Sequence, residues 1–282
     1  MASSSDTQDE RNALFSFLER EDRDRSLSLP FVPADRRTAL AALYAFNAET
    51  ARIRDLVSQP MPGEIRLQWW RDLIASGASG GSGHPTGDAL LETISHYDLP
   101  RSAFDRFLEA RIFDLYDDPM SSRTAFEAYA GETQSTLIML AAMVLSRPDA
   151  GQISDAAGHA GVAQTVGAVI RALPLHRRRG QIYVPADILS ASGCMPEAFL
   201  KAEPEPASRA LAALIAFGRD HDTRWRERVA AVPKALRPAF LPATLSSGIF
   251  QAAEKVGIGA FSEPITIGPL RKSWRYWRAM RG

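Results

Sequence analysis

Residues 161–189 read GVAQTVGAVIRALPLHRRRGQIYVPADIL, an apolar helical pattern that leads into a basic turn. The apolar positions recur at spacings of three and four, which places them along one face of a helix. The same spacing recurs over most of the chain, whereas the alternating pattern of β-strands is scarce. The sequence therefore predicts an all-α protein.

The composition narrows the class of protein. The chain has 282 residues, of which 45% are hydrophobic and 23% are charged, enough to bury a large core in one domain. The charges of its 33 basic and 33 acidic side chains cancel, so the chain has no overall positive charge that would favour nucleic acid as a partner. A single cysteine, Cys194, excludes an intramolecular disulfide and a cysteine-based zinc cluster, and we expect its side chain to be partly buried. These features are typical of a soluble cytoplasmic protein.

The expected organisation is a disordered polar tail at residues 1–11 and one helical domain over residues 12–282. The Gly/Ser-rich stretch 76–88 is expected to form a flexible surface loop with His84 exposed in it. The longest apolar run, residues 137–145, is far shorter than the ~20 residues of a membrane span and predicts a buried helix. Helices are predicted at residues 12–21, 34–57, 63–75, 88–97, 101–114, 122–145, 154–172, 196–202, 206–229 and 233–255, and at the C-terminus.

Two acidic clusters could suggest metal binding. Asp114, Asp117 and Asp118 lie before a proline and a serine, a pattern that also fits a helix end followed by an N-cap. The Asp-His-Asp run at residues 220–222 is surrounded by arginines and fits the solvated face of a charged helix. We favour the structural interpretation of both clusters.

The C-terminal segment GPLRKSWRYWRAMRG, residues 268–282, predicts a basic, aromatic helix. Trp and Tyr prefer membrane interfaces and cations favour anionic lipid, so this helix could lie at a membrane surface. Cations in the last turn also complement the helix dipole without any membrane. Both interpretations remain open from the sequence.

Two stretches resemble the squalene/phytoene synthase family: residues 29–55, LPFVPADRRTALAALYAFNAETARIRD, and residues 161–189. The second stretch aligns with the family pattern without a gap, and Tyr129 and the segment QWWRD at residues 68–72 also fall on family positions. The resemblance implies a single-domain isoprenoid synthase-type helical fold with a central cavity. It also implies head-to-head condensation of two prenyl diphosphates, with magnesium ions held between two facing DxxxD motifs.

The chain departs from the family at the metal-binding positions. The four family aspartates correspond to Ala51, Asp55, Ala172 and His176, so only Asp55 keeps a carboxylate. One carboxylate cannot assemble a three-ion magnesium cluster, so we predict that condensation is lost and expect no cofactor. Pro174 is expected to end or kink its helix, which would also remove the face of the second motif.

The replacements resemble a narrower, non-catalytic branch of the family, the respiratory complex I assembly-factor-like proteins of mitochondria and bacteria. The stretches that carry this resemblance are AFNAE at residues 45–49, TQS at 133–135 and RALPLH at 171–176. The resemblance implies a pseudoenzyme that acts as an assembly or lipid- or anion-binding factor. Its expected partners are a prenyl or anionic lipid and a membrane protein under assembly, with a peripheral location on the inner face of a membrane.

Basic side chains near the family cavity could hold an anion directly, where the family uses metal ions. The candidate substrate- or anion-binding residues are Arg52, Asp55, Tyr129, Arg171, His176, Arg179 and Tyr183. One alternative is an active head-to-head prenyl transferase that uses magnesium, Asp55 and further acids such as Asp114 or Glu132. Another is a helical scaffold whose cavity is filled by side chains.

Overall fold

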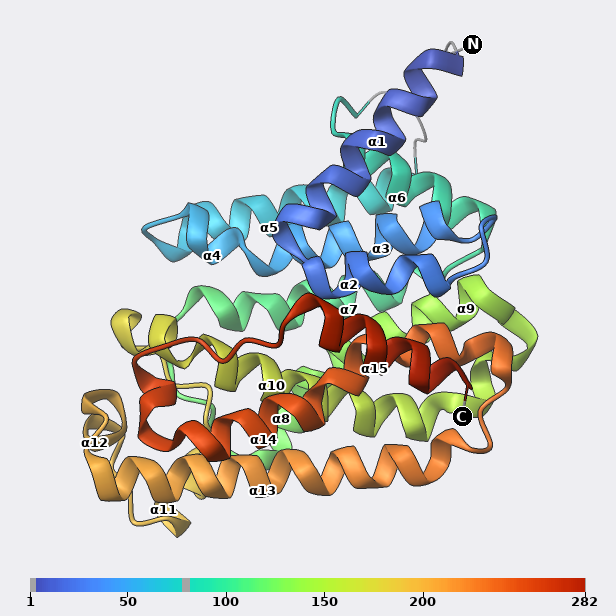
Figure 1. The fold of residues 1–282 in the computed structure, drawn as a ribbon. Coiled ribbons are helices and arrows are strands. Elements are labelled where there is room, and N and C mark those ends of the chain that lie inside the picture. Colours follow the sequence, from blue (N-terminus) through green and yellow to red (C-terminus); the bar gives the residue numbers. More distant parts are fainter. Residues whose placement is uncertain (1–3, 78–81, 282) are drawn as a thin grey trace.

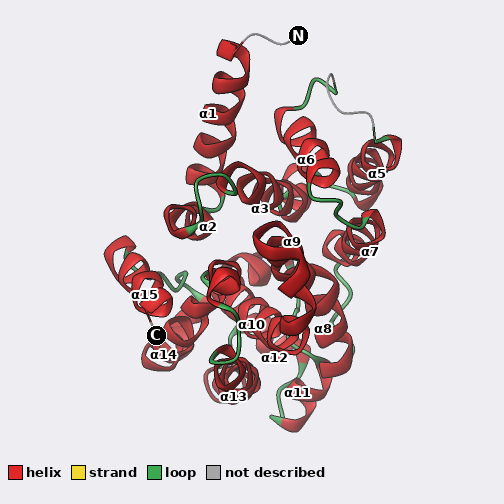
Figure 2. Cartoon of the chain, turned by 90° about the vertical axis from the view of Figure 1, so that its right-hand side faces the viewer, coloured by secondary structure: helices red, strands yellow, loops and turns green. Residues whose placement is uncertain are grey.

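The computed structural model describes residues 4–77 and 82–281, with side chains from Asn12 onward. Every regular element within these ranges is a helix, which confirms the predicted all-α class (Figure 2). The α-helices are α1 Ser4–Glu21, α2 Arg23–Ser28, α3 Arg37–Ala51, α4 Ile53–Leu56, α5 Pro60–Ser76, α6 Pro85–His96, α7 Arg101–Arg111, α8 Arg123–Ala130, α9 Thr136–Ala150, α10 Ser154–Arg179, α11 Ala186–Ala191, α12 Pro196–Lys201, α13 Pro204–Val229, α14 Ser246–Val256 and α15 Pro269–Arg281. Within the described ranges, no helix combines the length and the hydropathy that a membrane crossing needs.

Two layers of helices build the bundle, as Figure 1 shows: α1, α3, α5 and α6 form one layer, and α10, α13 and α14 form the other. The buried side chains gather in two clusters, one around α3, α7 and α9 and one around α10, α13 and α14. Helix α10 belongs to both clusters, because Ala160 and Ala163 lie in the first while Val166 and Ile170 lie in the second. This helix therefore joins the two halves of the core.

A close helix crossing fixes the position of α10. Gly161 of α10 packs against Ser135, the last residue of a π-helical turn, Gly131–Ser135, that connects α8 to α9. A Cβ atom built on Gly161 would lie 2.1 Å from the Ser135 Oγ and 2.5 Å from the Ser135 backbone nitrogen. Only glycine allows the two backbones to come this close.

Several predicted boundaries differ from the structure. Helix α1 begins at Ser4, so it extends through residues that we expected to form a polar tail. The helix predicted over residues 34–57 is broken at Arg52, whose φ of −91° and ψ of 0° separate α3 from α4. Helix α6 already begins at Pro85, inside the stretch 76–88 that was predicted to be a loop, while residues 78–81 of that stretch lie outside the described residues.

The expected interruption at Pro174 is wrong. Helix α10 continues through Pro174 to Arg179 and ends at Gly180, which has a φ of 71°. A proline removes one backbone hydrogen bond, but Leu173 and Pro174 are buried, and packing of this kind can hold a helix together across such a gap. Ala172 and His176 therefore do share one helix face, one turn apart.

The crossing at Gly161 predicts opposite effects for two glycines of α10. Gly161→Ala should lower the free energy of unfolding by about 1–3 kcal/mol, because the new methyl group meets the backbone of Ser135. Gly158→Ala is the matched control, since a Cβ there meets nothing within 4 Å. It should stabilise the helix by about 0.5–1 kcal/mol. Urea unfolding of both variants measures the two effects, and equal destabilisation would contradict the close crossing.

Candidate functional site

Two adjoining cavities of about 620 Å³ and about 200 Å³ open between the helix layers. They share five lining residues, Ala51, Asp55, Arg111, Gln134 and Ala168. The larger cavity extends toward α2 and α15, and the smaller one toward the C-terminal part of α10. Cavities of this size argue against a scaffold whose interior is filled by side chains.

The structure brings all seven predicted candidate residues to these cavities. Arg52 and Arg171 line the larger cavity, and Asp55 lines both. The remaining four line the smaller one: Tyr129, His176, Arg179 and Tyr183.

Ion pairs engage the charged candidates. Arg179 of α10 lies 2.6 Å from the carboxylate of Asp55, and Arg52 lies 3.0 Å from that of Glu21. Arg171 lies 2.5 Å from the carboxylate of Asp24, which also pairs with Lys272 of α15. Burial alone would raise the pKa of Asp24, but these two cations lower it below its ordinary value.

The residues at the family's metal positions do not fit a magnesium cluster. Ala51, Asp55, Ala172 and His176 all line the smaller cavity, so the four positions lie where a metal site would need them. Of these four residues only Asp55 offers a carboxylate, and its partner is Arg179. Across residues 12–77 and 82–281, no cluster of three or more His, Cys, Asp or Glu side chains could hold a metal ion.

Asp114 is the centre of a buried hydrogen-bonded group in the smaller cavity. Its carboxylate accepts hydrogen bonds from the hydroxyl groups of Tyr129, at 2.8 Å, and Tyr183, at 2.9 Å. It also forms an ion pair of 3.0 Å with Arg111. Burial raises the pKa of both tyrosines well above the ordinary value, so both hydroxyls keep their protons and act as donors. Because three donors already surround it, this carboxylate is not free to bind a metal ion.

A chain of polar contacts connects Asp114 to the larger cavity. Arg111 donates to the Oδ1 of Asn47 at 3.0 Å, and Gln134 donates to the same oxygen at 3.4 Å. Arg25 of α2 in turn donates to the Oε1 of Gln134 at 2.5 Å. None of these residues was predicted as a site residue, although Asn47 and Gln134 stand in the motifs AFNAE and TQS.

The structural interpretation is confirmed for the first acidic cluster and is wrong for part of the second. Ser122 caps α8 by accepting a hydrogen bond from the Ala125 amide, as expected. The solvated face predicted for residues 220–222 is wrong for His221 and Asp222, which are each 6% exposed. Asp222 accepts hydrogen bonds from Trp225 and Arg226, so the run is part of the packing between helices.

Acids proposed for the enzyme alternative lie apart or are occupied. Glu132 pairs with Arg106 and lines a separate groove of about 500 Å³ beside α7 and α8. Asp117, which belongs to the first acidic cluster, pairs with Arg54 at 3.3 Å. Cys194 is 3% exposed, which confirms its predicted burial.

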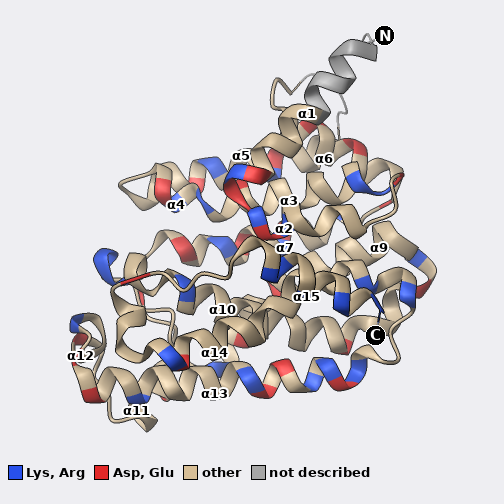
Figure 3. Ribbon diagram, viewed as in Figure 1, with Lys and Arg blue, Asp and Glu red and all other residues tan. Residues whose placement is uncertain are grey.

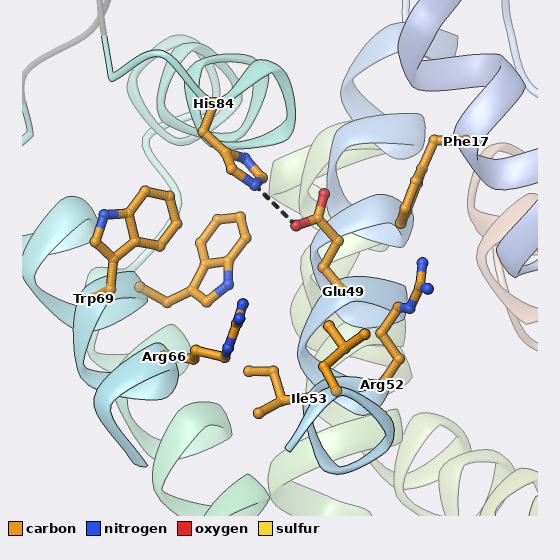
Figure 4. A pocket seen from close by; sticks show the side chains of 9 residues that line it. Phe17, Glu49, Arg52, Ile53, Arg66, Trp69 and His84 are labelled. Atoms are coloured by element: carbon orange, nitrogen blue, oxygen red, sulfur yellow. Dashed lines mark ion pairs between the residues drawn. The ribbon is translucent and has the colours of Figure 1, made fainter. Parts of the chain in front are cut away.

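A further pocket of about 490 Å³ lies on the other side of α3, and Figure 4 shows its side chains. The ring of His84 lies against the rings of Trp69 and Trp70, with centroids 5.1 and 5.4 Å away. Its Nε2 lies 3.1 Å from the carboxylate of Glu49, and this hydrogen bond raises the pKa of His84 (Figure 4). The expectation that His84 would be exposed in a loop is therefore wrong, because it caps α6 and packs against α3 and α5.

The fold and the cavity define the class of protein. The family model for squalene/phytoene synthases matches residues 18–273, and the chain belongs to this family. A dehydrosqualene synthase structure superimposes with a TM-score of 0.83 at 16% identity, over 98% of this chain and 96% of the other. A squalene synthase from Alicyclobacillus acidocaldarius gives a TM-score of 0.76 at 17% identity, over 93% and 98% of the two chains. These structures share the fold with this chain.

Curated relatives carry a different kind of name. The chain is 28% identical over 267 residues to NADH dehydrogenase (ubiquinone) complex I, assembly factor 6, of Rattus norvegicus. It is 27% identical to the protein of that name from Homo sapiens. Each alignment covers 93% of this chain and 80% of the relative.

The burial of His176 should make the stability of the fold depend on pH. Burial lowers its pKa to about 4, from an ordinary value of 6.5, and its Nδ1 has no hydrogen-bond partner in the described chain. Between pH 6.5 and about pH 4, His176 binds a proton more tightly in the unfolded chain than in the folded one. The free energy of unfolding therefore decreases as the pH falls through this range. The contribution of this group reaches up to about 3 kcal/mol.

Chemical unfolding of the wild type and of His176→Gln at pH 7 and at pH 4.5 tests this dependence. The variant should lose less stability on acidification, although the lowered pKa values of His159 and His221 leave part of the decrease in place. His96→Gln, an exposed position on α6, is the control and should behave like the wild type. Parallel pH profiles of wild type and His176→Gln would contradict the buried, neutral state of His176.

Proposed function

We propose that this chain is a non-catalytic squalene/phytoene synthase-like protein that acts as an assembly factor and binds an anion or anionic lipid in its cavity. The observation that carries the proposal is the set of residues at the four metal positions. Three of these positions lack a carboxylate, and Asp55 at the fourth is neutralised by Arg179 at 2.6 Å.

The chemistry of the family explains why these replacements remove catalysis. Departure of a diphosphate leaves a large negative charge, which magnesium ions neutralise when several carboxylates hold them. Asp114, the next acid in the smaller cavity, already accepts two phenolic hydrogen bonds and pairs with Arg111. Metal-dependent ionisation of a prenyl diphosphate therefore lacks its ligands in this chain.

The charge of the larger cavity supports anion binding. Its lining includes seven basic and four acidic side chains, so basic groups are in excess. Arg52 and Arg171 have about a third of their side-chain surface exposed, at 35% and 39%. An incoming phosphate or diphosphate could accept hydrogen bonds from these guanidinium groups in bidentate geometry. The apolar Pro242, Leu245 and Ile249 on the same lining would suit a hydrocarbon tail.

The names of the relatives support the assembly role. The alignments with these relatives cover 93% of this chain, and the relatives are named as assembly factors of complex I. A corresponding role for this chain would bring it to a respiratory membrane enzyme, at the inner face of a membrane.

Titration with farnesyl diphosphate separates binding from catalysis. The purified chain should bind the ligand without magnesium and should form no condensed product when magnesium is added. Arg171→Ala with Arg179→Ala should weaken binding by about tenfold or more, because each substitution removes a charge-assisted hydrogen-bond donor. Arg178→Ala, an exposed neighbour that lines neither cavity, is the matched control.

Calorimetry measures the affinity, and product extraction measures the turnover. Turnover at ordinary enzyme rates, about 1–1000 per second, would overturn the non-catalytic proposal. Equal affinities of the wild type and the double variant would overturn anion binding at these arginines. The two results are independent, so each part of the proposal can fail alone.

The assembly role has its own test. The tagged full chain, expressed in its own host, should co-purify from solubilised membranes with subunits of complex I, and its removal should lower the amount of assembled complex. The variant Arg171→Ala with Arg179→Ala shows whether the cavity is needed for this role. Normal levels of assembled complex I in cells that lack the chain would contradict the proposal.

A further inference from the structure

Helix α15 has two faces of different character. Its inner face carries Lys272 and Tyr276, which are 9% and 0% exposed. Its outer face carries Leu270, Trp274 and Trp277, which are 87%, 54% and 45% exposed. These three positions are spaced by four and three residues, so they form one apolar stripe along the helix. Large apolar side chains that share an exposed stripe indicate a contact with something outside the chain.

Three arginines share this outer face. Arg271, Arg278 and Arg281 are all exposed, and α15 contains no acidic residue. The Arg278 guanidinium lies 5.5 Å from the ring centroid of Trp274, and that of Arg281 lies 4.0 Å from that of Trp277. The aromatic rings and the positive charges are therefore combined in one surface. Helix α15 lies at the edge of the bundle (Figure 2), and Figure 3 marks its basic positions in blue.

We propose that this outer face of α15, defined by Leu270, Arg271, Trp274, Trp277, Arg278 and Arg281, docks onto the surface of an anionic phospholipid bilayer. Indole rings prefer the boundary between headgroups and acyl chains, where an apolar ring and a polar N–H are both satisfied. Guanidinium groups beside them pair with phosphates of the same headgroup layer. An amphipathic helix with this combination lies in the plane of the membrane.

The inner face of α15 anchors this surface to the bundle. The Tyr276 hydroxyl donates to the Asp24 backbone carbonyl at 3.0 Å, and Lys272 pairs with the Asp24 carboxylate. Arg275 donates to the Ser247 hydroxyl at 3.0 Å. These contacts use the side of α15 away from the stripe, so docking requires no rearrangement of the fold.

Docking would also orient the larger cavity. Lys272 lines that cavity, one helix thickness away from Trp274 and Trp277. A bilayer on the outer face would therefore lie one helix away from the part of the cavity lining that Asp24, Arg171 and Lys272 form. The inference on α15 stands apart from the proposed function, because vesicle binding by this face requires no ligand in the cavity.

Flotation with lipid vesicles tests the proposal on the full chain. The wild type should bind vesicles of phosphatidylcholine with about 30% phosphatidylglycerol and should bind pure phosphatidylcholine vesicles far less. A charge-reversal variant, with Arg271, Arg278 and Arg281 each changed to Glu, should lose at least about a hundredfold in partition coefficient, since each basic residue near an anionic surface contributes about fivefold. Trp274→Ala with Trp277→Ala should also weaken binding, because it removes the apolar part.

Matched controls distinguish this surface from general charge. A second charge-reversal variant, with Arg178, Lys201 and Lys255 each changed to Glu, alters the net charge equally at exposed positions on α10, α12 and α14. It should lose much less binding than the α15 variant. Equal losses in both variants, or no binding of the wild type to anionic vesicles at low salt, would overturn the proposal. Thermal unfolding checks that each variant is folded, and a blue shift of Trp emission in the wild type, absent from the Trp double variant, reports insertion of the stripe.

Discussion

The close contact between Gly161 and Ser135 sets the position of α10, on which both halves of the molecule depend. Helix α10 contributes side chains to both core clusters and carries Arg171, His176 and Arg179 to the cavities. A larger residue at position 161 would push α10 away from the π-helical turn. Because packed interiors transmit such shifts, the cavity walls would move with it. The glycine therefore determines the site from a position outside it.

Ion pairs connect helices around the cavities of this chain, where the family resemblance implies a diphosphate held by magnesium ions. The pair between Asp55 and Arg179 connects α4 to α10, and Asp24 connects α2 to both α10 and α15. Opposite charges held at these distances keep the cavity walls in register without a metal. These cross-links belong to the chain itself, and the replaced positions Ala51, Ala172 and His176 take no part in them. A cavity that is stable in this way is consistent with a protein that binds without reacting.

The sequence predicted the parts of the molecule that local patterns determine. The helical class follows from spacing, and the family and the position of the seven candidate residues beside the cavities follow from short motifs, since a motif places its residues on a known face. Their role in binding stays a prediction. Arg111 was missed because its partners Asn47 and Asp114 approach it only in the folded state. Burial of His221 was missed because charged neighbours along the helix hid its contact with His159, at 3.0 Å. The prediction at Pro174 failed because tertiary packing outweighed a local preference.

Asp24 joins the second helix of the chain to the last one. The residues that it pairs with, Arg171 and Lys272, lie 147 and 248 positions further along the sequence. Contacts of such long sequence separation form late in folding, because the loop that they close is costly in entropy. During synthesis, the helices of the layer formed by α1, α3, α5 and α6 leave the ribosome long before α15 does. The part of the cavity lining that Lys272 completes is thus the last part of the cavity to form, once α15 has been synthesised.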